Sequence, residues 1–315
     1  MKHVGCIGLG HIGHHLAANL LTAGYEVTVH DLDAAAARSL IENGAHWADS
    51  PAETARACEA VITCLPSVTA VTAVVAGEQG LLDGFAPGGT WIDMSTNDLH
   101  ELQRLAALAA EKGVDTLEAP VTGGCHNASS GTITILVGGE DAAFERRRDI
   151  FEAVGGRILH IGPLGKASII KVITNMLAFI HIAASAEAFM LAKRGGIDLR
   201  LAWEAIRASS GNSFILETES TTILGGSYDV GFSFDLCLKD MGFAMALGRE
   251  VDVPLDIAGT VEQLFVRGRA HYGGQAEYAM VAKLLEEACG TDLRAPGFPT
   301  SLEEYLERMP RAAVD

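Results

Sequence analysis

Short apolar runs alternate with amphipathic segments through the first half of the chain. Seven runs rich in Val, Ile and Thr predict β-strands, at His3–Ile7, Glu26–His30, Ala60–Leu65, Thr90–Met94, Thr116–Glu118, Thr132–Val137 and Arg157–Ile161. Between the strands, apolar residues recur at helical spacing, as Ile12, Leu16 and Leu20 do. Strands that alternate with helices favour a parallel sheet covered by helices on both faces.

The strand pattern stops at Gly165, and the second half of the chain has a helical texture. Lys166–Arg194 is predicted as one long helix that ends at Gly195 and Gly196. Further helices are expected at Leu199–Ala208, Asn212–Leu224, Phe234–Arg249, Leu255–Arg269 and Gln275–Ala288. A length of 315 residues suits two domains. The prediction is an α/β domain over residues 1–164, a helical domain over 165–293, and a loosely packed tail over 294–315.

Composition narrows the class of partner. The chain has 23 Lys and Arg against 40 Asp and Glu, a formal net charge of −17. This balance argues against nucleic acid or an anionic membrane surface as the main partner, because both attract basic patches. A small anionic substrate remains compatible with it, since a few cations in a cleft outweigh a distant acidic surface.

Cysteine usage and hydropathy indicate the compartment. The six cysteines are scattered and contain no C-x-x-C pair, so they are interpreted as reduced thiols in a cytoplasmic protein. The first residues run directly into a strand, without a signal-peptide pattern. Met176–Leu191 is the most apolar long stretch, but it is short for a membrane span and contains His181 and Glu187. It is therefore predicted to be a buried helix.

A glycine motif follows the first strand and opens a helix. It reads Gly8, Leu9, Gly10, His11, Ile12 and Gly13. The first glycine permits a tight turn, the second lets the backbone approach a pyrophosphate, and the third lets helix and strand pack closely. The N–H groups at the helix start then face the phosphates. The alternative is a glycine-rich turn that binds no ligand.

An acid at the end of the next strand strengthens the dinucleotide interpretation. Asp31 lies 18 residues after Gly13, where a carboxylate accepts hydrogen bonds from the adenosine ribose and repels a 2′-phosphate. Leu32 follows it, so no cation is offered to such a phosphate. The pattern favours NAD over NADP as cofactor. His11, His14 and His15 have metal-binding spacing, but no Cys or carboxylate completes a set nearby, and no metal is predicted.

Four motifs in order resemble the β-hydroxyacid dehydrogenase family. The first is the glycine motif with Asn19-Leu20 and Gly24, and the second is Glu118-Ala119-Pro120-Val121-Thr122-Gly123-Gly124 with Ala128 and Gly131-Thr132. The third is Gly162-x-x-Gly165 with Lys171 and Asn175. The fourth is Phe234 with Leu238-Lys239-Asp240. The resemblance extends to about Leu285. It implies an N-terminal Rossmann domain, a helical C-terminal domain, a long helix joining them, and NAD(P)-linked oxidation of a small β-hydroxyacid.

Lys171 and Asn175 are the candidate catalytic residues. Oxidation of an alcohol needs both a hydride acceptor and a proton acceptor. Lys171 interrupts an apolar helical stretch, and burial there would favour the neutral amine that a base requires. Asn175 is four residues later, on the same helix face, and can orient the lysine or the substrate hydroxyl. The pattern alone leaves a snorkelling Lys and a solvated Asn as an equal alternative, and the resemblance favours catalysis. Lys166, at the helix start, is expected to be exposed.

The remaining candidates bind the substrate or the cofactor. Thr122, Gly123 and Gly124 combine a hydroxyl with accessible N–H groups that suit a carboxylate, although an ordinary strand-to-loop turn has the same composition. By resemblance, Lys239 reaches the substrate and the nicotinamide, where the alternative is a surface ion pair. Further positions that line the cofactor by resemblance are Leu65, Pro66 and Thr96.

These residues predict an NAD-dependent dehydrogenase of a short β-hydroxyacid of the 3-hydroxyisobutyrate type, with cofactor and substrate in a cleft between the domains. A semialdehyde or imine reductase is the alternative within enzymes, and a non-catalytic dinucleotide-binding module is the alternative outside them. The family has Ser, Gly, Gly and Asn where this chain has Thr122, Asn127, Ala167 and Thr174. These departures leave the substrate open. A homodimer or homotetramer is expected, with Met176–Leu191 suited to a subunit interface.

Overall fold

The computed structural model describes residues 2–302 of the chain. The chain divides into two compact units, Met1–Lys171 and Val172–Asp315, and each is described separately. The first is built on a mostly parallel sheet and the second is helical, which confirms the predicted fold class. The helix α8 (Lys166–Arg194) contributes residues to both units, and the predicted boundary after residue 164 stays a prediction.

The sheet of the first unit has the strand order of a dinucleotide-binding fold. Its strands are β1 (His3–Ile7), β2 (Glu26–His30), β3 (His46–Trp47), β4 (Ala60–Thr63), β5 (Thr90–Asp93), β6 (Asp115–Glu118), β7 (Val121–Thr122), β8 (Ile133–Gly138) and β9 (Gly155–Gly162). The order is β3-β2-β1-β4-β5-β6-β8-β7, and β9 pairs with β8. Pairing is parallel from β3 to β6 and antiparallel where β8 meets β6 and β7. All seven predicted strands are present, with ends shifted by at most two residues. β3 and β7 have two residues each, too few to show a period.

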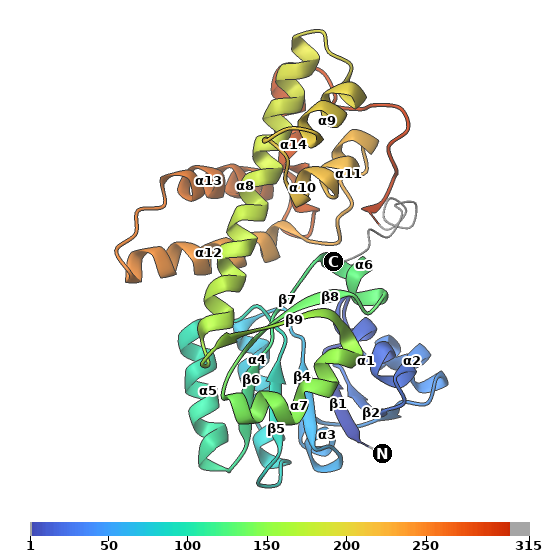
Figure 1. Ribbon diagram of the computed structural model, residues 1–315, viewed down its shortest axis with the longest axis vertical. Helices are drawn as coiled ribbons and strands as arrows, with labels where there is room; N and C mark the ends of the chain where they lie inside the picture. The colour runs from blue at the N-terminus through green and yellow to red at the C-terminus, as the bar shows by residue number, and fades with distance from the viewer. Residues whose placement is uncertain (1, 303–315) are drawn as a thin grey trace. The chain divides into compact units, whose positions relative to one another are not determined.

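Helices cover both faces of this sheet (Figure 1). They are α1 (Gly13–Thr22), α2 (Arg38–Glu42), α3 (Pro51–Ala57), α4 (Val68–Ala76), α5 (Leu99–Glu111), α6 (Gly124–Ser129) and α7 (Asp141–Val154), with short 3₁₀ turns at Ala34–Ala37 and Leu81–Asp83. One core contains Leu16, Leu20 and Phe151 from α1 and α7. A second core contains Val71 and Leu105 from α4 and α5. The buried faces match the helical spacing of the sequence.

The second unit packs its helices around aromatic side chains. Besides α8 it contains α9 (Leu199–Arg207), α10 (Phe214–Glu217), α11 (Ser220–Gly225), α12 (Phe234–Glu250), α13 (Asp256–Tyr272), a 3₁₀ turn at Tyr278–Met280 and α14 (Val281–Cys289). Phe179, Phe265 and Tyr278 form mutual edge-to-face and tilted contacts in its centre. Such pairs add specific geometry to the burial of apolar area.

Three sequence predictions in the helical unit were wrong in detail. The single helix expected at Asn212–Leu224 is two short helices, because Thr218 leaves the helical conformation at φ −108° and ψ −82°. The helix expected from Gln275 begins only at Tyr278, with a 3₁₀ turn. The start of the expected loose tail is packed: the Ala295 N–H donates to the Leu224 carbonyl, and the Phe298 ring meets Trp203 edge-on. Residues 303–315 of that tail lie outside the described residues.

The long helix α8 is buried along one face only. Its length and composition would allow it to cross a membrane, but the core helices of soluble proteins meet the same criteria. In its most apolar 18-residue segment, 39% is buried. Phe179, Ile182 and Phe189 are enclosed in the core of the helical unit. Leu177 and Leu191 are exposed, at 43% and 76%. The predicted buried helix therefore also presents apolar side chains on its surface.

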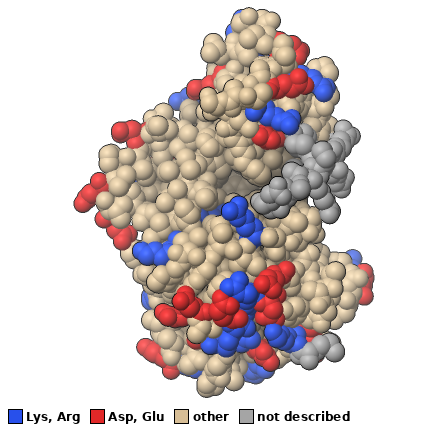
Figure 2. Space-filling view, in the orientation of Figure 1, with Lys and Arg blue, Asp and Glu red and all other residues tan. Residues whose placement is uncertain are grey.

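Charged residues of both signs are interspersed on the face shown in Figure 2. Around α7, Arg146 pairs with Asp115, Arg147 with Glu59, and Arg148 with Glu145. Exposed pairs of this kind contribute little to stability. These three arginines of α7 are therefore paired with neighbouring carboxylates.

Replacing Phe151 with alanine should destabilise the first unit strongly. The side chain is fully buried and packs in the core with Phe144. We expect a loss of about 3–5 kcal/mol in the free energy of unfolding, measured by urea denaturation. Leu32→Ala is the control, because Leu32 is fully exposed, and its effect should stay within about 0.5 kcal/mol. Equal effects of the two variants would contradict this assignment of the core.

Candidate active site

The glycine motif forms a tight turn between β1 and α1. Gly8 has φ +89°, and a Cβ there would lie 2.4 Å from the carbonyl oxygen of Cys64. A Cβ on Gly13 would lie 1.9 Å from the Gly8 carbonyl oxygen, so only glycine allows this close approach. Around Gly10 a Cβ would meet no atom within 4 Å, which leaves its backbone accessible. The turn therefore fits a dinucleotide pyrophosphate, with exposed His11 and half-buried Ile12 beside it.

Asp31 is fixed beside this turn by two backbone N–H groups. Its Oδ2 accepts from the Leu9 N–H at 2.6 Å, and its Oδ1 accepts from the Asp33 N–H at 2.9 Å. The carboxylate follows β2 directly, at the position where the sequence predicts an acceptor for the ribose. Leu32, the next residue, is fully exposed and offers no cation.

Two of the three histidines of the glycine segment, His14 and His15, make local contacts. The rings of His14 and His15 meet edge-on, with centroids 5.8 Å apart. The Nε2 of His14 lies 3.4 Å from the Ser39 hydroxyl. Among residues 2–302, no three His, Cys, Asp or Glu side chains are grouped as metal ligands.

Asp93, a buried acid at the end of β5, holds the loops that follow β4 and β5. Asp93 is 1% exposed and accepts from the Thr63 hydroxyl at 2.9 Å, the Ser95 N–H at 3.1 Å and the Asn97 amide at 3.1 Å. Burial raises the pKa of Asp93, and the hydrogen bonds from Ser95, Thr63 and Asn97 oppose the rise. Sequence reasoning missed this residue, although an acid that ends an apolar strand and precedes Ser and Thr is a usable signal.

Through Ser95 this network reaches the predicted cofactor positions. The Ser95 hydroxyl accepts from the Leu65 N–H at 2.9 Å, which fixes the start of the loop that continues to exposed Pro66. Thr96, half-buried, lies between Ser95 and Asn97, which both bond to Asp93. Leu65, Pro66 and Thr96 therefore lie on two loops that hydrogen bonds hold together after neighbouring parallel strands.

Thr122, Gly123 and Gly124 join β7 to α6 through a strained turn. Gly123 has φ +120° and Gly124 has φ +80°, conformations that favour glycine. The amide of Asn127 donates to the Gly123 carbonyl at 2.9 Å and stabilises the turn. Neither glycine has a side chain of its own that could cover the backbone N–H groups, a composition that suits an anion.

The helix α6 is tied to the helix of the glycine motif. The Asn19 amide on α1 donates to the Ala128 carbonyl on α6 at 2.7 Å. The helix α6 carries His126, whose Nδ1 is buried and has no hydrogen-bond partner among residues 2–302. Burial lowers the pKa of His126 to about 4, so the ring is neutral near pH 7. The hydrogen bond from Asn19 therefore ties α6, which follows the predicted carboxylate motif, to α1, which follows the glycine turn.

Lys171 is buried on α8, and Lys166 is exposed. The Lys171 side chain is 8% exposed, five residues into the helix. Burial of a lysine is rare without a specific partner or function. Asn175 follows one helical turn later, where residues separated by four positions share a face. The exposure of Lys166 agrees with the sequence prediction that it is the solvated lysine of the pair.

In the second unit, Asn175 is oriented by a buried acid. Its Nδ2 donates to the Oδ2 of Asp240 at 2.6 Å, and Asp240 is 1% exposed. Because a carboxylate only accepts, the amide must turn its NH₂ group toward Asp240. Sequence reasoning noted Asp240 only as a neighbour of Lys239 and missed this contact, since 65 residues separate the two partners.

Lys239 forms an ion pair with the same acid. Its Nζ lies 2.9 Å from Asp240 Oδ1, off the direction of a hydrogen bond, and also lies over the Phe243 ring at 5.2 Å. Because the Lys239 side chain is 20% exposed and Asp240 is buried, this pair differs from the surface ion pair that the sequence left as an alternative. The short N–O distance supports a real electrostatic contact despite the poor alignment.

Comparisons with known proteins cover nearly the whole chain. Residues 3–162 match the family described as the NAD binding domain of 6-phosphogluconate dehydrogenase. Residues 165–285 match the family described as NAD-binding of NADP-dependent 3-hydroxyisobutyrate dehydrogenase. The chain is 34% identical to 2-(hydroxymethyl)glutarate dehydrogenase of Eubacterium barkeri, over 92% of this chain and 97% of the relative. It is 30% identical to 3-sulfolactaldehyde reductase of Escherichia coli, over 92% and 98%.

Solved structures share the fold. A crystal structure of 3-hydroxyisobutyrate dehydrogenase from Salmonella typhimurium has a TM-score of 0.83 and 30% identity, and the match covers 90% of this chain and all of that one. An imine reductase from a Pseudomonas species matches at 19% identity with a TM-score of 0.60, a likeness that shows the fold alone.

Removing the charge of Asp31 should shift the cofactor preference. Asp31→Asn keeps the side-chain shape and one oxygen that accepts from a backbone N–H. The neutral amide no longer repels a 2′-phosphate. We expect the ratio of kcat/KM for NADP to that for NAD to rise about tenfold or more. Asp33→Asn is the matched control, because Asp33 is exposed and its carboxylate accepts from the Ala35 N–H of its own turn. An equal rise in both variants would assign the effect to general surface charge.

Proposed function

Because the chain belongs to the β-hydroxyacid dehydrogenase family, we propose that it oxidises the hydroxyl of a short β-hydroxyacid of the 3-hydroxyisobutyrate type. The chain is an NAD-dependent oxidoreductase that acts on hydroxyl donors. The observation that carries the proposal is the burial of Lys171 on α8, one turn before Asn175, in a chain whose glycine turn fits NAD. A proton acceptor and a cofactor turn are the two parts that alcohol oxidation requires.

The proposed chemistry divides between the cofactor and the chain. The nicotinamide of NAD, when bound, accepts the hydride from the carbinol carbon. Gly8, Gly10 and Gly13 would hold the pyrophosphate, and Asp31 would bind the ribose. The Nζ of Lys171 takes the hydroxyl proton, so the substrate C–O single bond becomes a carbonyl and the lysine becomes an ammonium. Lys171 is buried, and burial in general disfavours the charged form of a lysine, which suits the neutral amine that this step needs.

Asn175 and the anion-binding turn position the substrate in this proposal. The Asn175 amide directs its NH₂ group to Asp240, and its carbonyl oxygen would orient the lysine or the substrate hydroxyl. Thr122, Gly123 and Gly124 bind the carboxylate through the hydroxyl and the backbone N–H groups. Lys239 would supply a positive charge for the substrate, which its ion pair with Asp240 partly offsets.

A reductase of a small semialdehyde is the second candidate. It is favoured by the likeness to a relative named 3-sulfolactaldehyde reductase. The same residues serve that direction, because a Lys171 ammonium returns its proton to the carbonyl oxygen as hydride arrives. The two candidates therefore differ in substrate and preferred direction and share every proposed role of the chain's residues. The cytoplasm is the proposed compartment.

Replacing Lys171 with alanine should abolish turnover with cofactor binding retained. The test follows NADH absorbance with NAD or NADP and a panel that includes 3-hydroxyisobutyrate, 3-hydroxypropionate, serine, threonate, glycerate and 6-phosphogluconate. Loss of a general base costs about 10²–10⁴ in kcat. Lys166→Ala is the matched control and should keep activity, because Lys166 is exposed at the start of the same helix. A Lys171→Ala enzyme with full activity would refute the assignment of the base.

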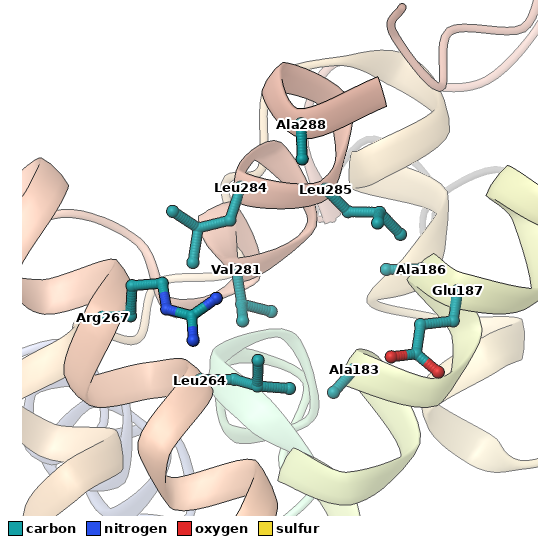
Figure 3. Close-up of a pocket in the computed structure, with 9 residues that line it drawn as sticks. All are labelled: Ala183, Ala186, Glu187, Leu264, Arg267, Val281, Leu284, Leu285 and Ala288. Atoms are coloured by element: carbon teal, nitrogen blue, oxygen red, sulfur yellow. The ribbon is translucent and has the colours of Figure 1, made fainter. Parts of the chain in front are cut away.

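We also propose that α8 forms a contact between copies of the chain. A cavity of about 130 Å³ lies among α8, α13 and α14 of the helical unit (Figure 3). Glu187 of α8 and Arg267 of α13 line its otherwise apolar walls, and no ion pair joins them in the part of the chain that the structure describes. A two-fold contact would offer each of these charges a partner from the second copy. The exposed Leu191, one turn after Glu187, extends the same face.

A charge at Leu191 should weaken this association. We expect Leu191→Glu to elute as a smaller species than the unaltered chain in size-exclusion chromatography with light scattering, because a carboxylate in an apolar contact must be desolvated. Val253→Glu is the control, since Val253 is also half exposed but lies in the loop before α13. A monomer for the unaltered chain, or an unchanged mass for Leu191→Glu, would count against the proposed contact.

A further inference from the structure

Glu118 is a buried carboxylate that the proposed mechanism does not use. It ends β6 and is 1% exposed. Its register partner on β8 is Gly138, where a Cβ would lie 2.2 Å from Glu118 Oε1. A side chain at that position would therefore displace the carboxylate. The sheet leaves room for one acid at the edge where β6 meets β8.

Among the described residues, Glu118 accepts four hydrogen bonds, from Gly165 and from the first turn of α8. Oε1 accepts from the Gly165 N–H at 2.5 Å and the Ala167 N–H at 3.0 Å. Oε2 accepts from the Ser168 N–H at 2.9 Å and from the Ser168 hydroxyl. The first N–H groups of a helix have no partner within the helix. Glu118 satisfies them from a strand 47 residues earlier in the chain.

The local sequence provides no substitute for this contact. Gly165 precedes the helix and has no side chain with which to cap it. Burying an ionised carboxylate is costly unless hydrogen bonds compensate, and burial raises the pKa of Glu118 while the bonds from Ser168, Ala167 and Gly165 oppose the rise. Interaction with the positive end of a 29-residue helix also favours the anion.

Lys171 follows Ser168 by three residues, which is less than one helical turn. The hydrogen bonds from Ala167 and Ser168 therefore fix the backbone turn from which the lysine side chain extends. We infer that Glu118 is a positioning residue that sets the place of Lys171 by anchoring the first turn of α8 to the sheet. The inference rests on the proposed role of Lys171 as the base, and it concerns no contact between Glu118 and the substrate.

Because Glu118 anchors the helical turn that carries Lys171, a change at Glu118 should lower the rate of the proposed reaction. A displacement of about 1 Å in a reacting group can cost about 100-fold in rate. Glu118→Gln keeps the size of the side chain but replaces one acceptor oxygen with an NH₂ group that faces N–H donors. We expect this variant to lower kcat roughly 100-fold with little change in the KM for NAD. Glu118→Asp keeps the charge but is shorter by one methylene, so it should restore activity only in part.

Two matched controls separate positioning from general stability. Glu286→Gln changes another buried glutamate, which bonds to Tyr228 and the Leu293 N–H in the helical unit. Ser168→Ala removes one donor to Glu118 and is the mild test variant if Glu118→Gln fails to fold. Ser185→Ala is its control, because Ser185 is a buried serine of the same helix whose hydroxyl donates only to the His181 carbonyl.

Hydrogen exchange of the intact chain gives a readout that requires no substrate. In Glu118→Gln and Ser168→Ala, we expect faster exchange in the peptide that covers the first turn of α8, and no such change in Glu286→Gln or Ser185→Ala. Unchanged exchange in that peptide, or a fall in kcat that the controls share, would overturn the inference. If Lys171→Ala is fully active, the proposed base is wrong. If Lys171→Ala is inactive while Glu118→Gln keeps full kcat, only the role of Glu118 is wrong.

Discussion

One continuous helix carries the two residues on which the proposed chemistry depends. α8 provides Lys171 and Asn175 one turn apart, so its backbone fixes their spacing whatever else moves. The helix is long and apolar because one face forms the core of the helical unit. Its first turn, in contrast, is bonded to the sheet through Glu118. Its start therefore belongs structurally to the dinucleotide-binding unit and the remainder to the helical unit.

Three buried acids hold residues of the candidate site. Asp93 ends β5, Glu118 ends β6, and Asp240 lies within α12. Asp93 holds the loops that follow β4 and β5, Glu118 holds the start of α8, and Asp240 orients Asn175. A buried carboxylate is stable only when donors surround it, so each acid imposes a geometry on several neighbours at once. A neutral acceptor with one oxygen could not satisfy as many donors.

The sequence predicted the elements well and the contacts between distant residues poorly. The observed bounds of the long helix and of the strands β1 and β2 match the predicted bounds to the residue. The spacing of apolar residues and the glycines at element ends are local signals, so the sequence alone defines these elements. The glycine turn and Asp31 were also predictable, since backbone conformation and spacing alone define them. The break at Thr218 was not, because tertiary contacts such as the Trp203 N–H to the Leu216 carbonyl fix that region. The contacts of Glu118, Asp93 and Asp240 were not predicted, because their partners are brought together only by the fold.

Affinity for an anion in this acidic chain has to arise from local groups. The formal charge of −17 repels a carboxylate at long range, and salt screens such repulsion beyond about 10 Å. His126 adds no charge beside the glycine pair near pH 7, because burial lowers its pKa to about 4. Asp240 offsets much of the charge of Lys239. In the proposed function, the backbone N–H groups of Gly123 and Gly124 are therefore the groups that we expect to recognise a carboxylate.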